Sequence, residues 1–202
     1  MEFELTTARL RLRPLRRGDA PRVQALCNNW NVVSMLSRVP YPNPLDVVEA
    51  WTGAQASAWE KGSAYNFAIE NKEGKTQGEV VGVVGIARRD DGNPGGGYEI
   101  GYWLGEPWWG QGLMTEAVAR AVEFARSELE LEKLHSDYFA DNPASGRMQE
   151  KCGFRITGRG RLNSLSRRCK VDAVFTEIEL IYADRGTDGG RGAGENTDGA
   201  AS

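Results

Sequence analysis

The most regular apolar pattern of the chain lies between residues 113 and 125. Leu113, Ala117, Ala121 and Ala125 recur at the spacing of one helical turn, which predicts an amphipathic helix with a broad apolar face. The run just before it, 98–104, is short, partly aromatic or β-branched, and flanked by glycines, which favours a strand. The middle of the chain therefore predicts a strand, a tight turn and a helix in direct succession.

Patterns elsewhere along the chain also alternate between strand-like and helix-like spacing. Asp19 and Asp46 stand where they would cap helices over 19–28 and 46–61, and a further helix is expected over 143–151. Strands are expected over 10–13, 65–70, 79–87, 134–140, 154–158 and 171–182, with a glycine-rich hairpin connection at 90–97. This order predicts one α/β domain over 1–183. From residue 184 the apolar periodicity stops, so 184–202 is expected to be a disordered glycine-rich tail.

Composition narrows the class of protein. A chain of 202 residues can bury one sizeable core, and its net charge of −3 argues against a nucleic-acid binder. The three cysteines have neither disulfide nor metal spacing, and His135 is the only histidine, so no metal site is expected. The acidic opening residues do not resemble a signal peptide, and no run approaches the roughly 20 apolar residues of a membrane span. We therefore expect a cytoplasmic protein without membrane contact.

The turn between the central strand and helix favours an anion site. Gly110 and Gly112 flank Gln111, and the helix pattern starts directly after them. Unpaired N–H groups at a helix N-terminus attract phosphate, and glycines let it approach the backbone closely. The dinucleotide-binding fingerprint fails because Thr115 stands where its third glycine belongs, and the Walker pattern fails because Leu-Met-Thr follows Gly112. The pattern therefore predicts a phosphorylated ligand of another kind.

Six short motifs follow one another in a fixed order along the chain. They are Thr7-Ala8-Arg9-Leu10-Arg11-Leu12-Arg13-Pro14, Glu99-Ile100-Gly101-Tyr102-Trp103, Trp109-Gly110-Gln111-Gly112, Thr115-Glu116-Ala117, Asp141-Asn142-Pro143-Ala144-Ser145 and Glu150-Lys151-Cys152-Gly153-Phe154. Together they resemble the GNAT N-acetyltransferase superfamily, and most closely its RimJ/RimL type, which acetylates protein N-terminal amines. The resemblance spans about residues 3 to 182.

The resemblance implies a fold and a cofactor site. It implies a mixed, mostly antiparallel sheet with helices on both faces, in which the strands at 100–104 and 134–138 are parallel and splay apart to admit the pantetheine arm of acetyl-CoA. The residues implied to bind this co-substrate are Tyr102, Trp103, Leu104, Trp109, Gly110, Gln111, Gly112, Leu113, Met114, Thr115 and Asn142. One departure is Pro107, which stands where the family usually has Gln or Arg and removes one N–H from the phosphate loop.

Catalysis of amine acetylation needs a neutral amine and a stabilised leaving thiolate. An α-amine with a pKa of about 7.7–8.0 is roughly 10–17% neutral at pH 7, so a modest base suffices, and Glu99 is the candidate. Its alternative role is a cross-strand or tethering carboxylate. Many superfamily members carry a Tyr where Gln149 stands, whereas RimL-type enzymes use a serine that Ser145 matches. The alternative role of Ser145 is a first-turn residue that bonds its own backbone, and the alternative role of Asn142 is an N-cap.

The leading prediction is an enzyme that transfers acetyl directly, in a ternary complex, to a protein or peptide N-terminal amine. Two alternatives stay open: a small-molecule amine as acceptor, and a non-catalytic acyl-CoA-binding domain. The segment 35–41 and Trp30 are expected to border the acceptor cleft or to pack in the core, and a homodimer is possible. The basic run 167–170 is expected to be solvated, His135 to be an ordinary strand residue and Cys152 to be a core residue.

Overall fold

The fold is built on one eight-stranded sheet. The computed structural model describes residues 3–89 and 97–180, and in them the strands follow the order β1-β2-β3-β4-β5-β6-β8-β7. All neighbouring pairs are antiparallel except β5 and β6, which are parallel. The strands are β1 Leu5–Thr6, β2 Leu10–Pro14, β3 Ala64–Asn71, β4 Val80–Arg88, β5 Tyr98–Leu104, β6 Lys133–Phe139, β7 Arg155–Ser164 and β8 Cys169–Glu179.

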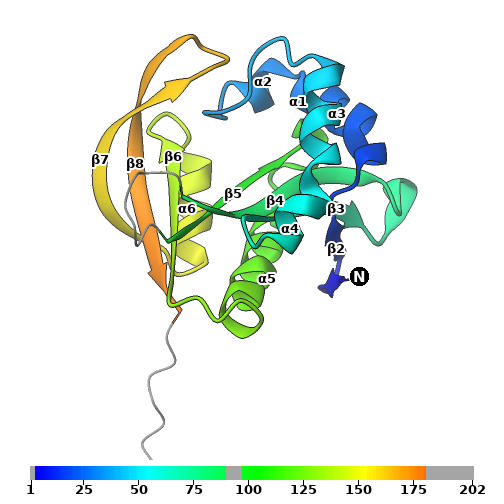
Figure 1. The fold of residues 1–202 in the computed structure, drawn as a ribbon. Coiled ribbons are helices and arrows are strands. Elements are labelled where there is room, and N and C mark those ends of the chain that lie inside the picture. The colour runs from blue at the N-terminus through cyan, green and yellow to red at the C-terminus, as the bar shows by residue number, and fades with distance from the viewer. Residues whose placement is uncertain (1–2, 90–96, 181–202) are drawn as a thin grey trace, which may run out of the picture.

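Helices cover both faces of this sheet, because its central strands are apolar on both sides. Along β3, Phe67 belongs to one core and Ala68, the next residue, to the other, as the alternation of side chains in a strand requires. The face of Phe67 carries α5 and α6, and the face of Ala68 carries α1 and α3. The helices are α1 Ala20–Cys27, α2 Trp30–Val33, α3 Leu45–Gly53, α4 Gln55–Glu60, α5 Leu113–Ser127 and α6 Pro143–Lys151. The expected mixed α/β fold is confirmed (Figure 1).

Helix α5 fits tightly against the sheet because its inner face is made of small residues. Ala117, Ala121 and Ala125 are fully buried, and Phe124 closes the apolar face near its C-terminal end. Helix α5 contacts β2, β4 and β5, so its N-terminus is fixed at the end of β5. The predicted succession of strand, turn and helix is confirmed at this point.

The parallel strands β5 and β6 separate soon after they begin. They are paired only at Tyr98 with Leu134 and at Glu99 with His135. At the next position the Ser136 hydroxyl, and not a backbone group, donates to the Ile100 carbonyl at 2.9 Å. Beyond this point the two strands diverge, and the turn of the β7–β8 hairpin bends over toward the chain that follows α2, where the Leu165 N–H donates to the Ser37 carbonyl at 3.0 Å (Figure 1). The expected splayed pair is confirmed.

Several local predictions were wrong. The Asp19 carboxylate does not cap α1, because it accepts from the Arg13 guanidinium at 2.7 and 2.8 Å and from the Arg16 N–H at 2.8 Å. The expected helix 46–61 is two helices, α3 and α4, that meet at Ala54, and Pro44 rather than Asp46 precedes the first of them.

Other boundaries differ in length or lie outside the described part. Strand β7 runs to Ser164 instead of ending at 158, because it pairs along most of β8. The short helix α2 was not predicted, since a single turn has too little periodicity to recognise. The hairpin connection at 90–97, the end of the last strand and the tail 184–202 lie largely or wholly outside the described residues. No helix in residues 3–89 and 97–180 is long and apolar enough to cross a membrane.

Candidate active site

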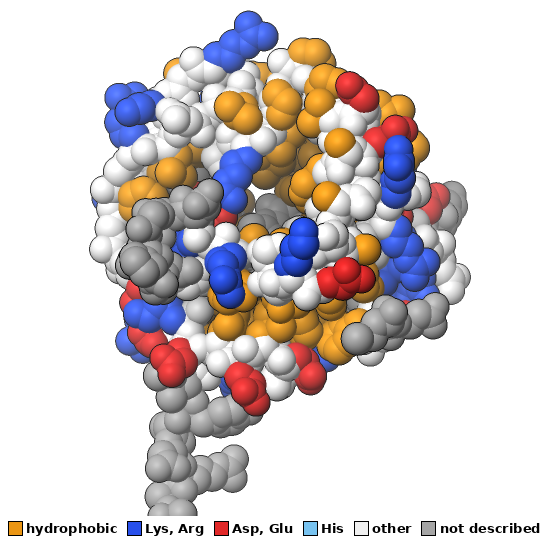
Figure 2. All heavy atoms as spheres, viewed as in Figure 1, with side chains coloured by type: hydrophobic (Ala, Val, Ile, Leu, Met, Phe, Trp, Pro, Cys, Tyr) orange, Lys and Arg blue, Asp and Glu red, His pale blue; other side chains and the backbone are white. Residues whose placement is uncertain are grey.

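A cleft of about 1440 Å³ opens where β5 and β6 separate. Figure 2 shows the hollow on this face, with hydrophobic side chains gathered around it. Of the thirteen predicted site residues, the exposed Gln111 is the one that does not line the cleft. The others that line it are Glu99, Tyr102, Trp103, Leu104, Trp109, Gly110, Gly112, Leu113, Met114, Thr115, Asn142 and Ser145.

The glycine turn forms one end of this cleft, which we call the cofactor half together with β5 and the start of α5. Gly110 and Gly112 have φ angles of 73° and 75°, in the left-handed region that favours glycine. A Cβ at Gly110 would meet no atom within 4 Å, so the space above the turn is open. Gly112 precedes α5 and offers no capping side chain, which leaves the first amides of the helix available to an anion. This arrangement fits a diphosphate.

An ion pair from the start of the chain clamps the turn. The Arg9 guanidinium donates to the Gln111 carbonyl at 2.9 Å and is paired with Glu116 at 2.7 Å. Burial raises the pKa of Glu116, but hydrogen bonds from Thr7 and Arg9 outweigh it, so the net pKa lies below its ordinary value. Glu116 stands in the first turn of α5, where its unpaired charge would repel a phosphate; Arg9 offsets that charge.

Pro107 is accommodated in a short 3-10 turn, Glu106–Trp108, ahead of the glycines. The Gln111 side chain folds back and donates to the Pro107 carbonyl at 3.0 Å, and the Trp109 indole donates to the Leu104 carbonyl at 2.8 Å. Both bonds hold the turn from within. Side-chain contacts thus hold the loop that contains Pro107, while the N–H that proline lacks is not replaced.

Two basic residues near the cofactor half were missed by the sequence analysis. Arg147 and Lys151 are four residues apart on α6, so they share one helix face, and both are exposed and line the cleft. Their charges suit a phosphorylated ligand. The signal available in the sequence was this spacing, read together with the Asn142 cap that orients α6.

The other end of the cleft, which we call the acceptor half, is formed by α2, α3 and residues 34–44 together with Glu99 and Asp137. Glu99 is paired with Arg38, whose side chain is 74% exposed whereas that of Glu99 is 19% exposed. Burial, and then the charge of Glu99, raise the pKa of Asp137, while Arg38 and Arg89 act against them. Arg38 lies in the segment 35–41 that was expected to border the acceptor cleft or to pack in the core, and it lines the cleft, but its pairing with Glu99 was not predicted. Asp137 was not predicted either, because it belongs to no recognisable motif and only the fold brings it to Glu99.

A hydrogen-bonded network joins the two halves. The Tyr102 hydroxyl lies 2.7 Å from the Ser145 hydroxyl and 2.7 Å from the Gln149 amide nitrogen. Burial raises the pKa of Tyr102 to about 12, while the hydrogen bonds with Ser145 and Gln149 act against it. Gln149 is 1% exposed, and the Asn142 side chain caps α6 by accepting from the Ser145 N–H at 3.2 Å. The resemblance implied that Tyr102 binds the co-substrate; its side chain in addition belongs to this network.

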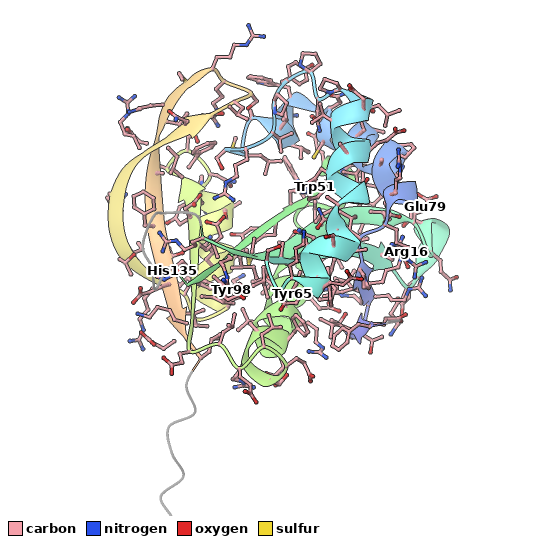
Figure 3. The ribbon with its side chains drawn as sticks, in the orientation of Figure 1. Arg16, Trp51, Tyr65, Glu79, Tyr98 and His135 are labelled. Carbon is pink, nitrogen blue, oxygen red and sulfur yellow. The ribbon has the colours of Figure 1, made fainter. Side chains whose placement is uncertain are left out.

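Features that the sequence analysis set aside are mostly structural. His135 lies on β6, lines no part of the cleft and has Glu177 at 3.8 Å; in Figure 3 it lies near Tyr98, which is on the neighbouring strand β5. Cys152 packs against the main core. Among the residues described, no three His, Cys, Asp or Glu side chains gather in a way that could hold a metal.

The expectation of a solvated basic run was wrong for Arg167. Its guanidinium donates to the Ser34 carbonyl at 2.6 Å, is paired with Asp141 at 2.5 Å, and lies 5.0 Å from the centre of the Phe139 ring. These contacts tie the β7–β8 turn to the acceptor half. The other members of the run, 168–170, are exposed.

Comparisons with known proteins agree with this geometry. The family model for the acetyltransferase (GNAT) domain matches residues 9–155. An uncharacterized N-acetyltransferase p20 of Bacillus licheniformis is 30% identical over 185 residues, which cover 89% of this chain and 98% of that protein. The [ribosomal protein uS5]-alanine N-acetyltransferase of Escherichia coli is 28% identical over 99 residues, 49% of each chain.

Solved structures show the same fold. The structure of RimL, a ribosomal L7/L12 alpha-N-protein acetyltransferase with coenzyme A, matches with a TM-score of 0.73 at 18% identity, over 88% of this chain and 98% of that one. A spermidine N-acetyltransferase of Vibrio cholerae with CoA and spermine matches with a TM-score of 0.68 at 22% identity, over 86% and 97%. The chain belongs to the GNAT family of acetyl-CoA-dependent N-acetyltransferases, and it is similar to ribosomal-protein N-acetyltransferases of the RimJ/RimL type.

Proposed function

We propose that this protein transfers the acetyl group of acetyl-CoA to the N-terminal α-amine of a peptide or protein, by direct transfer in a ternary complex. The observation that carries the proposal is the single cleft that brings the glycine turn, Glu99 and Ser145 together. Its two halves leave room for a donor at the glycine turn and an acceptor at Glu99 at the same time. A covalent acetyl-enzyme is not needed.

The donor is held by backbone groups in the cofactor half. Micromolar binding of acetyl-CoA requires about 8 kcal/mol, whereas a helix dipole contributes only about 0.3–1 kcal/mol. Charge-assisted hydrogen bonds contribute about 1.5–3 kcal/mol each, so several amides from Gly110 to Thr115 can supply most of this. Arg147 and Lys151 add charge at the same end of the cleft. Beside them, the unpaired edge of β5 past Ile100 suits the pantetheine arm.

The charge balance of the cleft favours an acceptor with one positive group. Four carboxylates and four cations line it, namely Glu99, Glu106, Asp137 and Asp141 against Arg38, Arg147, Lys151 and Arg167. Three of the carboxylates already have partners: Glu99 with Arg38, Glu106 with two asparagine side chains, and Asp141 with Arg167. A polyamine would need several open carboxylates, whereas an α-amine needs one.

The rim of the acceptor half favours a peptide. Trp30 and Trp51 are 46% and 39% exposed although both are large and apolar, and both line the cleft. Exposed apolar side chains beside a polar floor are suited to the side chains that follow an N-terminal amine. The energetics agree, because neutralising an α-amine at pH 7 costs about 1 kcal/mol, against about 4.6 kcal/mol for a lysine.

In the transfer step, Glu99 accepts the proton that the attacking amine loses as the C–N bond forms. Backbone N–H groups of β5 stabilise the charge that develops on the acetyl oxygen. The C–S bond breaks with its electron pair on sulfur, and the Ser145 hydroxyl donates a hydrogen bond to the departing thiolate. A thiolate leaves readily with a pKa near about 8.5, so a hydroxyl is a sufficient donor.

The experiment that tests this proposal measures thiol release from acetyl-CoA with matched acceptors. One set holds short peptides with free N-termini, and the other holds the same peptides N-terminally blocked, together with spermidine and aminoglycosides. We expect turnover with the free N-termini alone. Turnover restricted to the small amines would replace the acceptor, and binding of acetyl-CoA without any turnover would support a non-catalytic binding domain.

A further inference from the structure

We propose that Tyr102 is a positioning residue for acetyl transfer: its phenol, held by Gln149, donates to Ser145 and leaves the Ser145 hydrogen free to bond the departing sulfur. The inference rests on the acetyl transfer proposed above. It adds Tyr102 to the residues that support the transfer and assigns the direction of the hydrogen bonds around it. It starts from the buried amide of Gln149, whose orientation decides the direction of every hydrogen bond after it.

The Gln149 amide can be oriented without ambiguity. Its nitrogen lies 3.3 Å from the Asp137 carbonyl and 3.0 Å from the Ser136 hydroxyl. The carbonyl can only accept, and Ser136 already donates its hydrogen to the Ile100 carbonyl at 2.9 Å. The amide oxygen, in turn, lies 2.6 Å from the Thr176 hydroxyl, which can donate to it. A flipped amide would set its oxygen against two acceptors, so the nitrogen faces Ser136, Asp137 and Tyr102.

This orientation fixes the direction of the remaining bonds. The Gln149 nitrogen donates to the Tyr102 oxygen at 2.7 Å, so the Tyr102 hydrogen must point elsewhere. Its neighbour in that direction is the Ser145 oxygen at 2.7 Å. A Tyr102 hydrogen directed along this short contact makes Ser145 the acceptor, which is the direction we assign, and leaves the Ser145 hydrogen available to the cleft that Ser145 and Tyr102 both line. Hydrogen bonds in such a chain strengthen one another.

Tyr102 does not give its proton away in this arrangement. With its pKa near 12, the phenol holds its proton about 3,000-fold more tightly than a thiol at about 8.5. The electron pair of the broken C–S bond therefore stays on sulfur as a thiolate that accepts a hydrogen bond from Ser145, and Tyr102 keeps its proton throughout. The phenol, which comes from β5, thus orients and polarises Ser145, and Gln149 of α6 holds the phenol.

The first test separates kcat from KM. Tyr102→Phe removes the hydroxyl and keeps the ring, and we expect kcat to fall about tenfold, the effect of one hydrogen bond, with the KM for acetyl-CoA within twofold. Ser145→Ala should lower kcat at least as much, and adding Tyr102→Phe to it should cause no further loss. Tyr98→Phe is the matched control, because Tyr98 lies on the same strand, bonds the Gly62 carbonyl at 2.9 Å and does not line the cleft. Unchanged kcat in Tyr102→Phe, or losses that multiply in the double variant, would overturn the inference.

The second test needs no acceptor, so it stands even if the proposed acceptor is wrong. The thiol of bound CoA is titrated by the ultraviolet absorbance of its thiolate. A hydrogen bond from Ser145 favours the thiolate, so the pKa of the bound thiol should lie below that of free CoA in the wild type and in Tyr98→Phe. It should rise towards the free value in Ser145→Ala and in Tyr102→Phe. A Tyr102→Phe complex that titrates like the wild type would contradict the role assigned to the phenol, whatever amine the enzyme acetylates.

Discussion

The two halves of the cleft are made in different ways. The cofactor half is mostly backbone: two left-handed glycines, the first turn of α5 and the free edge of β5. The acceptor half is mostly side chains, which come from α2, α3, residues 34–44 and β6. Backbone groups suit a donor that is the same in every reaction cycle, whereas side chains can be substituted to suit a particular acceptor. Substitutions in the cofactor half should therefore affect binding of the donor, and substitutions in the acceptor half should affect binding of the acceptor.

The largest effect is expected for Gly112→Asp, which would place a carboxylate at the end of α5 that we propose binds the diphosphate. The affinity for acetyl-CoA should fall about 100-fold or more, equivalent to two lost charge-assisted hydrogen bonds. Isothermal titration with acetyl-CoA measures this.

A matched control for that variant is Gly74→Asp. Gly74 has a φ of 76°, a Cβ there would meet no atom within 4 Å, and it does not line the cleft. Gly74→Asp therefore places an aspartate in the same left-handed backbone conformation as Gly112→Asp, but away from the cleft. Equal affinities for acetyl-CoA in the two variants would show that the glycine turn does not hold the diphosphate.

A smaller effect is expected for Glu99→Gln. At pH 7, kcat/KM for an N-terminal amine should fall about 10- to 100-fold, as for loss of a modest general base. The loss should shrink as the pH rises through about 8, because the amine then deprotonates in solution. Steady-state rates between pH 6 and pH 9 (roughly the range that an α-amine titrates over) measure both parts.

The control for Glu99→Gln is Glu177→Gln, on β8 outside the cleft, where the carboxylate contacts Lys133 at 3.3 Å. Its profile should follow the wild type. A Glu99→Gln enzyme whose deficit is the same at every pH would assign Glu99 a role in binding or tethering instead of proton transfer.

Glu116→Gln should affect the stability of the cofactor half. The pKa of Glu116 lies below its ordinary value in the folded protein, so its stabilising effect is present above the ordinary value of 4.5 and is lost as the pH falls through the lowered folded value. The variant should lose about 1–2 kcal/mol of unfolding free energy at pH 7, consistent with loss of a charge-assisted pair to Arg9.

Urea unfolding of variant and wild type at pH 7 and in acid tests the sign. The two proteins should converge once Glu116 is protonated in both states. Glu79→Gln, which removes a half-exposed partner of Arg22, should change stability by less than about 1 kcal/mol. A deficit of Glu116→Gln that persists unchanged in acid would mean that its charge is not what clamps the turn.

The smallest effect is expected for Arg38→Gln in the acceptor half. The ion pair with Glu99 is largely exposed on the Arg38 side, so its loss is worth less than about 1 kcal/mol. Freeing Glu99 should lower the KM for the amine up to about fivefold and leave the affinity for acetyl-CoA unchanged. Arg168→Gln, an exposed position outside the cleft, serves as control. A change in acetyl-CoA affinity with no change for the amine would break the division of the cleft into two halves.

The same division explains how far the sequence could be read. Helix α6 was predicted with its observed bounds and α5 from its first residue, because Asn142, Pro143 and Gly112 are local signals that lie next to the elements they start. The splay of β5 and β6 and the fold came with the family resemblance and are confirmed.

What the sequence could not reveal depends on distant contacts. Arg38 reaches Glu99 and Arg9 reaches Gln111 only in the folded chain, and no periodicity records either contact. Gln149 was noted only as a missing tyrosine, since its bond to Tyr102 depends on the approach of α6 to β5. The prediction of one helix over 46–61 was wrong for a similar reason. The Gln55 side chain bonds the Trp51 carbonyl at 2.7 Å and Asn66 of β3 at 2.8 Å, and α4 packs against β3 instead of continuing α3.

The central claim is that the amine acetylated is an N-terminal α-amine. The most direct measurement offers one peptide that carries both a free α-amine and a lysine, incubates it with acetyl-CoA and the enzyme, and locates the acetyl group by tandem mass spectrometry. We predict acetylation at the α-amine, with the lysine unmodified. Acetylation of the lysine, or an unmodified peptide under conditions where a polyamine is acetylated, would contradict the claim.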